Sequence, residues 1–456
     1  MILANTISGH TIADTRNGSR PADPNAPPCA VRILRTDAEF DALEPVWNGL
    51  LQKSDASVFQ SFEWQRTWWK YFHGDLKLHI LLFERDGELV GIAPLCTERK
   101  KLLGIPVATR LNFIGVGLSD YLWPIVLKDR EETVMASFAA YLASTQREWD
   151  VFDLEDVNES AGCFRLLPEC LASSGLPVYR YQGNVCPRIP LPPTSEEFMA
   201  NLGSTASYNL KRKFKRLRSN FTSETELIRS ESDGIENAID DFSLIHGGRW
   251  KSQGHPSAFD DPHHRAFHVE ICRKFARRDW LRIFFLKVNG ERVAVNFSFN
   301  YRGTIYMYQS NAHGPEDVMK CSPGLLVRSV AMVEGINEGM RVFDFMRGNE
   351  AYKYREWDAR DSKNWLLRSS SRTAAGRVRF FLFLWAELIS KVLNRLKWEY
   401  FEYRRFRISS PDGVSVWGYL WRKSVSLIRI YIRYLARHLP WAGKTPATAD
   451  EAEGDA

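Results

Sequence analysis

The sequence predicts an α/β protein made of two similar mixed-sheet domains followed by a helical segment. Two stretches are alike: LHILLFERDGELVGIAPL begins at Leu78, and LRIFFLKVNGERVAVNFSF begins at Leu281. In each copy, a strand, a tight turn and a strand precede a further strand, a helix and a last strand. A chain of 456 residues, 44% of them hydrophobic, is also long enough for two or three domains with their own cores.

Each copy opens with a predicted β-hairpin. The turn is Asp86-Gly87 in the first copy and Asn289-Gly290 in the second. Both dipeptides are typical of type I′ turns, whose two central residues take positive φ. The two copies therefore predict the same local structure from different residues.

The similarity continues beyond the hairpins. We expect third strands in YLWPIVL from Tyr121 and TIYMYQSN from Thr304, then helices over EETVMASFAAYLAS and GLLVRSVAMVEGINEG. Both copies end on the triplet Val-Phe-Asp, at Val151–Asp153 and Val342–Asp344. An apolar run after a helix is typical of a buried strand with a parallel partner. The shared order and triplet predict an internal duplication.

The predicted boundaries follow from these copies and from composition. In chain order we expect a disordered lead (1–30), a non-catalytic N-terminal domain (31–192), a catalytic C-terminal domain (193–372), basic amphipathic helices (373–442) and a disordered tail (443–456). The lead lacks a basic start followed by a long apolar core, so we do not interpret it as a signal peptide. The sequence has no run of about eighteen apolar residues, so we do not predict a membrane-spanning helix.

Cysteine usage and charge narrow the class of protein. The seven cysteines form no C-x-x-C pair, which argues against a disulfide framework and favours a reducing cytoplasm. The net charge is +6, but residues 371–440 alone hold 14 Lys and Arg against 4 Asp and Glu. Two apolar stretches there, VRFFLFLWAELISKVLNRLKWEYF and KSVSLIRIYIRYLARHL, carry regularly spaced basic residues. They predict helices that pack on the domains or on a partner subunit, or that lie on an anionic membrane through residues 375–440.

A basic segment, STASYNLKRKFKRLRSN, lies between the copies. It carries six cations between Lys211 and Arg218, while Leu210, Phe214 and Leu217 recur at helical spacing. The spacing predicts a helix with an apolar inner face and a solvated basic face. The alternative is a contact for a phosphorylated or acidic acceptor.

The start of the predicted helix differs between the copies. In the second copy, Ser322 can cap the helix, Pro323 suits its first turn, Gly324 permits close backbone approach, and Lys320 and Arg328 are basic. The first copy reads LKDREETVMA at this place, and its acids would repel a phosphate. A helix start with free amides and nearby cations binds anions, so we expect a phosphorylated cofactor in the second copy. An ordinary helix cap is the alternative.

The loops after the two triplets differ as well. The first copy continues as LEDVNES and the second as RGNEAYKYREW. Asp344 lies near the carboxyl end of its strand, where open α/β sheets tend to bind ligands. Glu350, Tyr352 and Lys353 follow on the predicted loop. Asp153 matches Asp344 in the first copy, so a structural role is the alternative for Asp344, whereas Glu350 and Tyr352 have no such counterpart.

Two pairs that contain histidine have helical spacing. His246 and Trp250 lie four residues apart, where they either line an acceptor pocket or form a packed aromatic beside a solvated histidine. His264 and His268 have a spacing that metal sites use, but the preceding Asp-Asp-Pro indicates a helix cap. We therefore expect no metal.

Taken together, several segments resemble a known family. FQSFEWQRTWWKYF, GELVGIAPL, NLKRKFKRL, CSPGLLVRS and FDFMRGNEAYKYREW are similar to the GNAT-superfamily acetyltransferases of the CelD/BcsL type, which are associated with cellulose and exopolysaccharide synthesis. The resemblance covers roughly Val31–Ser370. The tandem arrangement also resembles the Fem aminoacyl transferases, which have two GNAT-like halves. The resemblance implies tandem GNAT-like domains with mixed sheets.

The resemblance implies a site for acetyl-CoA or another acyl-CoA in the second copy. The acyl-CoA would enter between splayed parallel strands at Tyr306–Asn311 and Val342–Phe345, and its pantetheine would pair with the edge near Ser310 and Asn311. The residues expected around its pyrophosphate are Lys320, Ser322, Gly324 and Leu325. The family pattern Gln/Arg-x-x-Gly-x-Gly/Ala has a second small residue that this loop lacks, so another acyl donor stays open.

The resemblance also implies roles in acyl transfer. Glu350 or Asp344 would act as the base, directly or through water, and Tyr352 as the acid. A strand amide would polarise the thioester carbonyl. Lys353 would bind an acidic acceptor or the CoA phosphates.

We therefore expect a cytoplasmic acyl-CoA transferase that acts on an amino sugar, a nucleotide sugar or a polysaccharide precursor. One alternative is a Fem-like transferase that binds aminoacyl-tRNA through Lys211–Arg218, and another is a non-catalytic scaffold of an exopolysaccharide complex. Outside the Fem-like alternative, nucleic acid is not expected as a partner. A homo-oligomer and a peripheral position on the inner face of the membrane stay open.

Overall fold

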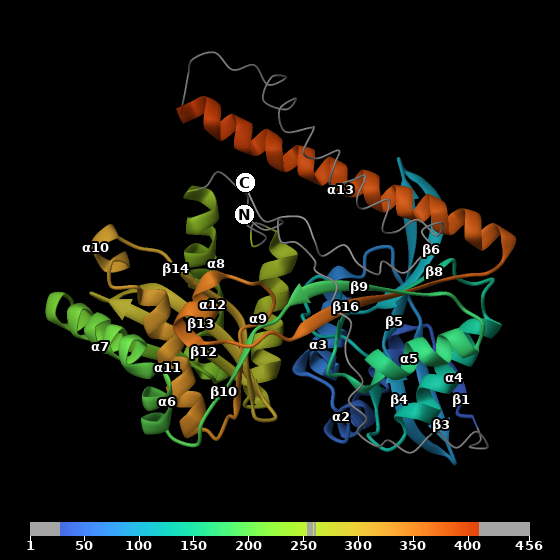
Figure 1. Ribbon diagram of the computed structural model, residues 1–456, viewed down its shortest axis with the longest axis horizontal. Helices are drawn as coiled ribbons and strands as arrows, with labels where there is room; N and C mark the ends of the chain where they lie inside the picture. Colours follow the sequence, from blue (N-terminus) through green and yellow to red (C-terminus); the bar gives the residue numbers. More distant parts are fainter. Residues whose placement is uncertain (1–27, 253–258, 260, 410–456) are drawn as a thin grey trace, which may run out of the picture.

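The structure, a computed structural model, describes residues 28–252, 259 and 261–409. Two α/β halves lie side by side, and a long helix, α13 (Ala374–Ser409), runs across the top of the view (Figure 1). Most of the predicted lead, the predicted tail and the second basic stretch, KSVSLIRIYIRYLARHL, lie outside the described residues.

The described strands form three sheets, with the orders β1-β3-β4-β7, β2-β5-β6-β8-β16-β9 and β10-β15-β14-β13-β12-β11. The four-stranded sheet contains β1 (Ala30–Leu34), β3 (Ile80–Arg85), β4 (Glu88–Ala93) and β7 (Ile125–Val126). The other sheet of the first half contains β2 (Lys77–Leu78), β5 (Leu95–Leu102), β6 (Ile105–Phe113), β8 (Val151–Asn158), β16 (Lys363–Ser370) and β9 (Val178–Val185). The sheet of the second half contains β10 (Arg188–Pro190), β15 (Val342–Asp344), β14 (Thr304–Ala312), β13 (Glu291–Tyr301), β12 (Leu281–Val288) and β11 (Ser223–Ile228).

Helices cover these sheets (Figure 1). Those of the first half are α1 (Asp37–Asp41), α2 (Glu44–Gln52), the 3₁₀ turn η1 (Val58–Gln60), α3 (Phe62–Phe72), α4 (Glu131–Ser144) and α5 (Gly162–Ser173). Those of the second half are α6 (Ser195–Asn201), α7 (Gly203–Asn220), η2 (Glu231–Asp233), α8 (Ile235–Ser252), α9 (Pro262–Arg277), α10 (Glu316–Met319), α11 (Pro323–Asn337) and α12 (Ala351–Trp357). No described helix is both long enough and apolar enough to cross a membrane.

Both predicted hairpins are confirmed. β3 and β4 are joined through Asp86 and Gly87, with φ of 54° and 78°, and β12 and β13 through Asn289 and Gly290, with φ of 52° and 87°. Two successive positive φ angles are the mark of a type I′ turn. The helix and final strand of each copy are confirmed too, because β8 pairs in parallel with β6 and β15 in parallel with β14.

The third strand predicted for the first copy is wrong. In YLWPIVL only Ile125–Val126 forms a strand, the short β7 beside β4. The parallel partner of β8 is instead β6, which forms a second hairpin with β5. Pro94 separates β4 from β5, and these two consecutive strands belong to different sheets of the first half. β5 reads LCTERKKL, and its run of charged residues interrupts the alternation of apolar and polar residues that indicates a strand. The hairpin was therefore not predicted from the sequence.

The two halves exchange strands reciprocally. β10 follows α5 of the first half but pairs with β15 of the second, whereas β16 follows α12 of the second half but pairs with β8 of the first. β16 also pairs with β9, and a bridge between Arg188 and Arg360 extends this contact, so the exchanged segments form one antiparallel ribbon across both sheets (Figure 1). β16 lies within the range 193–372 predicted for the second domain, yet it is an internal strand of the first half.

An aromatic core joins the two halves. Trp64 of α3 is fully buried, and its ring centroid lies 5.2 Å from that of Phe267 and 5.9 Å from that of Phe299, both in the second half. Its Nε1 donates a 2.8 Å hydrogen bond to Oγ of Ser119. Because the indole is buried by residues of both halves, the core fixes their relative position.

A second apolar cluster lies on the other face of the sheet of the second half, under α6, α7 and α11. Leu210 and Leu217 of α7 are buried in it, and the half-buried Phe214 packs against it, as the helical spacing predicts. α13 instead packs on the first half, where Phe380 and Phe383 contact the cluster around Val151.

Candidate active site

Strand β14 extends well beyond its parallel partner β15. The pairing joins only Thr304–Tyr306 to Val342–Asp344, and β14 then continues to Ala312 beside β13. Among the described strands, none pairs with the other edge of Met307–Ala312. This is the splayed pair that the family resemblance implies, with amides and carbonyls along an open edge.

Helix α11 begins beside that open edge. A Cβ added to Gly324 would lie 3.6 Å from Cβ of Ala312 and 3.4 Å from Nη1 of Arg328. Both are ordinary contacts, so the protein alone does not require glycine here. The close approach predicted at Gly324 therefore matters only toward a ligand.

The predicted cap of α11 is corrected in its details. Ser322 is the N-cap residue and Pro323 occupies the first turn, but Ser322 has a left-handed φ of 57° and its side chain makes no capping hydrogen bond. Instead, Nζ of Lys213 on α7 donates to Oγ of Ser322. Lys320 is exposed and forms a 2.8 Å ion pair with Glu316. Lys213 thus brings to the helix start a positive charge that the local sequence does not show.

Arg328 fills the space between β14 and α12. It is only 9% exposed, its Nη1 donates to Oγ of Ser310 at 3.3 Å, and its guanidinium lies 4.3 Å from the ring centre of Tyr352. Its Nη2 is 3.8 Å from Oε2 of Glu356, and its Nε has no hydrogen-bond partner in the described part of the chain. Burial lowers the pKa of Arg328. Arg328 thus lies at the helix start, as the sequence predicts, one helical turn after Gly324.

The loop predicted to carry Glu350, Tyr352 and Lys353 is partly helical. Ala351–Trp357 forms α12, Glu350 is its N-cap residue, and Asp358 ends it with a left-handed φ of 50°. Tyr352 and Lys353 are adjacent in α12, so their side chains point in different directions. Tyr352 faces Arg328 and Phe345, and Lys353 is buried.

Lys353 anchors the loop before α12. Its Nζ donates to the carbonyl oxygens of Met346, Arg347 and Gly348 at 3.2, 3.2 and 2.9 Å, and lies 2.8 Å from Oε2 of Glu350. These contacts use every proton of the buried ammonium. The geometry therefore opposes the predicted contact of Lys353 with an acceptor or with CoA phosphates and gives Lys353 a structural role instead.

The first half also holds this loop. The amide of Arg347 donates to Oδ2 of Asp120 at 3.1 Å, and the Arg347 guanidinium pairs with both Asp120 and Asp156. Burial raises the pKa of Asp156 to about 7, although Arg347 opposes the shift. The first half, which carries no candidate catalytic residue, thus positions the segment that leads to Glu350 and Tyr352.

Asp344 lies in a buried network at the strand exchange. Its Oδ2 accepts a 2.7 Å hydrogen bond from the Tyr121 hydroxyl and lies 3.3 Å from Nε of Arg188, while its Oδ1 accepts from the amide of Met346 at 2.8 Å. Burial raises the pKa of Asp344 to about 6, although Arg188 and Tyr121 lower it. Tyr121 and Arg188 escaped the sequence reasoning because they reach Asp344 from the other half or from the exchanged strand.

Asp153 takes the matching place in the first half. Arg368 of the exchanged β16 is its register partner, as Arg188 of β10 is for Asp344. Arg368 donates to Asp153 at 2.5 and 2.7 Å, and Arg110 donates at 3.0 Å. The shared triplet is therefore a structural device that ties each half to the strand it receives. Asp344 also lies on the face of the sheet opposite to Phe343, Phe345 and α11, so it does not join Glu350 and Tyr352 in one cluster.

His246 and His268 pack against neighbouring side chains. His246 lies beside Phe242 and Phe259, and the side chain of Trp250 lies outside the described residues. The cap before α9 is confirmed, because the Asp261 side chain accepts from the amide of His263. Both ring nitrogens of the buried His268 have partners, the carbonyl of His264 at 2.6 Å and the Tyr308 hydroxyl at 3.1 Å. Within the described ranges, no group of three or more possible metal ligands is present.

Comparisons with known proteins give a family match within the chain and similar solved structures. Residues 204–354 match the family described as Acetyltransferase (GNAT) domain. No curated protein matches the chain. Similar solved structures include FemX, with 12% identity and a TM-score of 0.50 over 74% of this chain and 96% of that one. L-PGS from Bacillus licheniformis has 11% identity and a TM-score of 0.45 over 79% of this chain and 97% of its own.

A conserved protein of unknown function from Bacteroides thetaiotaomicron VPI-5482 has 14% identity and a TM-score of 0.46, covering 74% of this chain and 100% of its own. At these identities, the similarity to FemX shows a shared fold. The chain is thus a mixed α/β protein of tandem GNAT-like domains with a helical C-terminal segment, and its second half carries the stretch that matches the acetyltransferase domain.

Proposed function

We propose that the protein transfers an acyl group from acetyl-CoA, or from another acyl-CoA, to an amino or hydroxyl group of a sugar or polysaccharide precursor. The observation that supports this most is the open edge of β14 beside the start of α11, within the stretch that matches an acetyltransferase domain. A strand edge and a helix start side by side offer amides to a pantetheine chain and to a pyrophosphate.

The donor would lie along this edge. Its pantetheine amides would pair with β14 near Ser310 and Asn311, which are half-buried and hydrogen-bonded to β13 only through their other edge. Its pyrophosphate would meet the amide of Gly324, because Pro323 has no N–H and the amides of Leu325 and Leu326 already donate to the carbonyl of Ser322, at 2.9 and 3.3 Å. Ser322 and Lys213 would add a hydroxyl group and a positive charge.

Glu350 and Tyr352 would carry the proton transfers. The new bond forms between the acceptor nitrogen or oxygen and the acyl carbon, and the bond from that carbon to sulfur breaks. Glu350 would take the acceptor proton, and Tyr352 would return a proton to the thiolate. The ion pair with Lys353 holds Glu350 at the start of α12, and the Arg328 guanidinium holds the Tyr352 ring.

The test combines acyl transfer with donor binding. Glu350→Gln and Tyr352→Phe should each lower kcat at least about 100-fold, since a positioned acid or base contributes about 10²–10⁴-fold. Matched controls are Glu334→Gln, at an exposed site of α11, and Tyr354→Phe, whose hydroxyl donates to Asp361. Full activity in both Glu350→Gln and Tyr352→Phe would disprove these roles.

A Fem-like transferase is the second candidate. The observation that favours it is the exposed basic face of α7, with Lys211, Lys215, Arg216 and Arg218 at the surface. Such a face binds an RNA backbone with marked salt dependence. Thermal-shift titrations with acetyl-CoA and with aminoacyl-tRNA separate the two candidates, because a ligand stabilises the folded state that binds it. Stabilisation by neither would favour a scaffold in an exopolysaccharide complex.

A peripheral membrane position is also proposed for α13. Val378, Phe381 and Trp385 are 62%, 40% and 38% exposed at helical spacing, with Arg377 and Arg379 exposed beside them. Apolar residues flanked by cations favour an anionic membrane surface. Co-sedimentation with anionic vesicles should weaken in Phe381→Glu/Trp385→Glu and stay unchanged in Glu334→Gln. Equal binding by both variants would contradict the membrane position.

A further inference from the structure

The hairpin formed by β5 and β6 reaches beyond the body of the first half. Lys100 pairs with Ala108 across the two strands, and Ala108 is buried in one cluster with Phe380 and Phe383 of α13. Past this point, every residue in the range 103–106 is exposed. Figure 1 shows the hairpin rising past α13 at the top of the view. The tip of the hairpin, residues 103–106, therefore projects into solvent beside α13.

This tip is apolar. Leu103 and Ile105 are 84% and 68% exposed, more than any other large hydrophobic side chain of the described residues. Pro106 beside them is exposed as well. Single exposed apolar side chains are common on protein surfaces, but these three share one protruding turn and form a contiguous patch. Patches of this kind mark contact sites for membranes or for other proteins.

The turn at the tip is built against conformational preference. Leu103 and Gly104 have φ of 50° and 86°, the two positive values of a type I′ turn. The first position is taken by Asp86 and Asn289 in the two hairpins described above, and such residues adopt a left-handed backbone more easily than leucine does. Packing within the protein does not offset this cost, because the Leu103 side chain lies in solvent. A strained and exposed leucine favours a contact outside the protein.

Cations lie directly behind the apolar tip. Arg99, Lys100 and Lys101 follow one another on β5, and residues 99–109 contain no acid. Lys101 lies 3.4 Å from the exposed Asp75, whereas neither Arg99 nor Lys100 forms an ion pair within the described ranges. An apolar tip with cations behind it complements a membrane with anionic headgroups, because the headgroups lie just outside the acyl chains.

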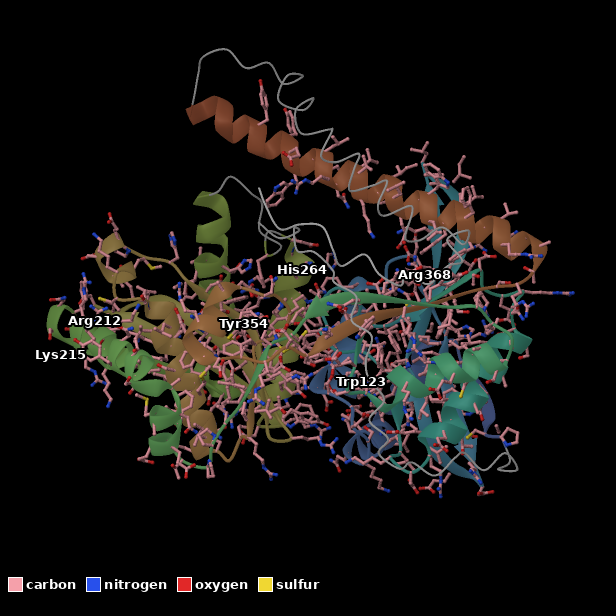
Figure 2. All side chains as sticks on the ribbon, in the orientation of Figure 1. Trp123, Arg212, Lys215, His264, Tyr354 and Arg368 are labelled. Carbon is pink, nitrogen blue, oxygen red and sulfur yellow. The ribbon has the colours of Figure 1, made fainter. Side chains whose placement is uncertain are left out.

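The neighbouring helix presents the same combination. Arg368 of β16 holds α13 against the first half, since its Nη2 lies 3.1 Å from Oε2 of Glu387 and its guanidinium lies 5.0 Å from the ring centre of Phe383. Figure 2 shows Arg368 on the side of α13 that faces the sheets. Phe381 and Trp385 of α13 are exposed, with exposed cations beside them. Two features that are both apolar and basic thus adjoin each other.

We infer that the tip of the β5–β6 hairpin inserts into an anionic membrane surface, with Arg99, Lys100 and Lys101 at the headgroups. Leu103 and Ile105 lie among the upper parts of the acyl chains, and the three cations meet the headgroup phosphates. The inference adds a second contact to the membrane position proposed for α13, and it does not depend on acyl transfer. A helix and a hairpin tip together fix the orientation of the protein on the membrane.

The experiment measures co-sedimentation of the full chain with vesicles of equal parts phosphatidylcholine and phosphatidylglycerol. Leu103→Asn/Ile105→Thr should weaken binding at least about tenfold, because burial of one such side chain in an apolar medium contributes about that much. Asparagine suits the left-handed turn position and threonine suits a strand, so the variant should keep the hairpin and the thermal unfolding of the wild type. The matched control is Leu244→Gln, which removes a similarly exposed leucine from α8 and should change binding less than twofold.

A second variant tests the cations without touching the turn. Lys100→Gln/Lys101→Gln should weaken binding to these vesicles and reduce its salt dependence, and it should leave the weak binding to pure phosphatidylcholine unchanged. The control is Lys211→Gln/Lys215→Gln, which removes two exposed cations of α7 in the second half. Equal losses in the two lysine variants would show that only net charge matters and would overturn the hairpin contact.

The remaining outcomes separate this contact from the other proposals. Equal binding by the wild type and Leu103→Asn/Ile105→Thr overturns the inference, and so does a wild type that binds no anionic vesicles. If that wild type instead forms a dimer that Leu103→Asn/Ile105→Thr dissociates in analytical ultracentrifugation, the tip is an interface between copies. Loss of binding in Phe381→Glu/Trp385→Glu alone leaves only the α13 contact, and loss in the hairpin variant alone leaves only the hairpin contact. Acyl transfer in solution should be the same in the hairpin variant as in the wild type, so the proposed function is decided independently.

Discussion

Asp344→Asn is expected to change how stability depends on pH. Asp344 is 1% exposed, and burial raises its pKa from the usual 3.8 to about 6. The folded protein therefore holds this proton more tightly than the unfolded chain does. The resulting stabilisation is fully present below pH 3.8 and is lost as pH rises through about 6.

The size of the effect follows from that interval. At about 1.4 kcal/mol per pH unit, the step from 3.8 to about 6 corresponds to about 3 kcal/mol. Asparagine cannot ionise, so the variant lacks this contribution. The free energy of unfolding of the wild type, minus that of Asp344→Asn, should fall by about 2 kcal/mol between pH 4 and pH 7, the rest of the step lying below pH 4. The contacts with Tyr121 and Arg188 add an offset that does not depend on this titration.

Urea unfolding followed by tryptophan fluorescence measures that difference at several pH values. Asp153→Asn is the matched control, because Asp153 takes the same place in the first half. Burial there is outweighed by Arg368 and Arg110, which lower the pKa of Asp153. Its stabilisation is thus present above pH 3.8 and lost only as pH falls below it, so the wild type should exceed Asp153→Asn by about 3–5 kcal/mol throughout pH 5–8. A constant difference for Asp344→Asn from pH 4 to pH 8 would refute the reasoning.

Three further outcomes are expected. Lys353→Met should lower the free energy of unfolding by about 2–4 kcal/mol and speed hydrogen exchange at 346–348, because three carbonyls lose their donor; unchanged exchange would contradict the anchor. Trp64→Ala should cost about 3–5 kcal/mol in urea unfolding, whereas a loss below about 1 kcal/mol would contradict a core shared by both halves. Residues 28–192 expressed alone should lack cooperative thermal unfolding by circular dichroism, because β8 and β9 lose β16 between them; a sharp transition would count against strand exchange.

Local signals in the sequence predicted much of the fold. Asp86-Gly87 and Asn289-Gly290 specify their turns by backbone preference alone, so both hairpins could be placed without any tertiary information. The apolar period of α7 likewise predicted its buried face. Strand exchange could not be predicted in this way, because the pattern of β16 shows that it is a strand but does not name its partner. Pairing between residues far apart in sequence is decided by the whole core.

The candidate site was predicted in position more than in detail. The open edge of β14 is what the family resemblance implies, and the start of α11 follows from the order of strand, helix and strand. The roles of Lys353 and Arg328 depend on what surrounds them: one is enclosed by carbonyl groups and the other lies on an aromatic ring. A lysine in a polar loop and an arginine in a helix look alike in sequence whether they are buried or solvated.

The reciprocal ribbon bears on how such a chain could arise. In a half-length ancestor with this topology, the sheet would lack one strand, and the last strand of the chain would be free to pair with the sheet of another copy. Two identical copies could satisfy each other by trading those strands, with an Asp-Arg pair at each junction, as Asp153 with Arg368 and Asp344 with Arg188 still show. Joining the two copies in one gene makes that association independent of protein concentration. It also frees one copy to lose its chemistry while it continues to brace the other.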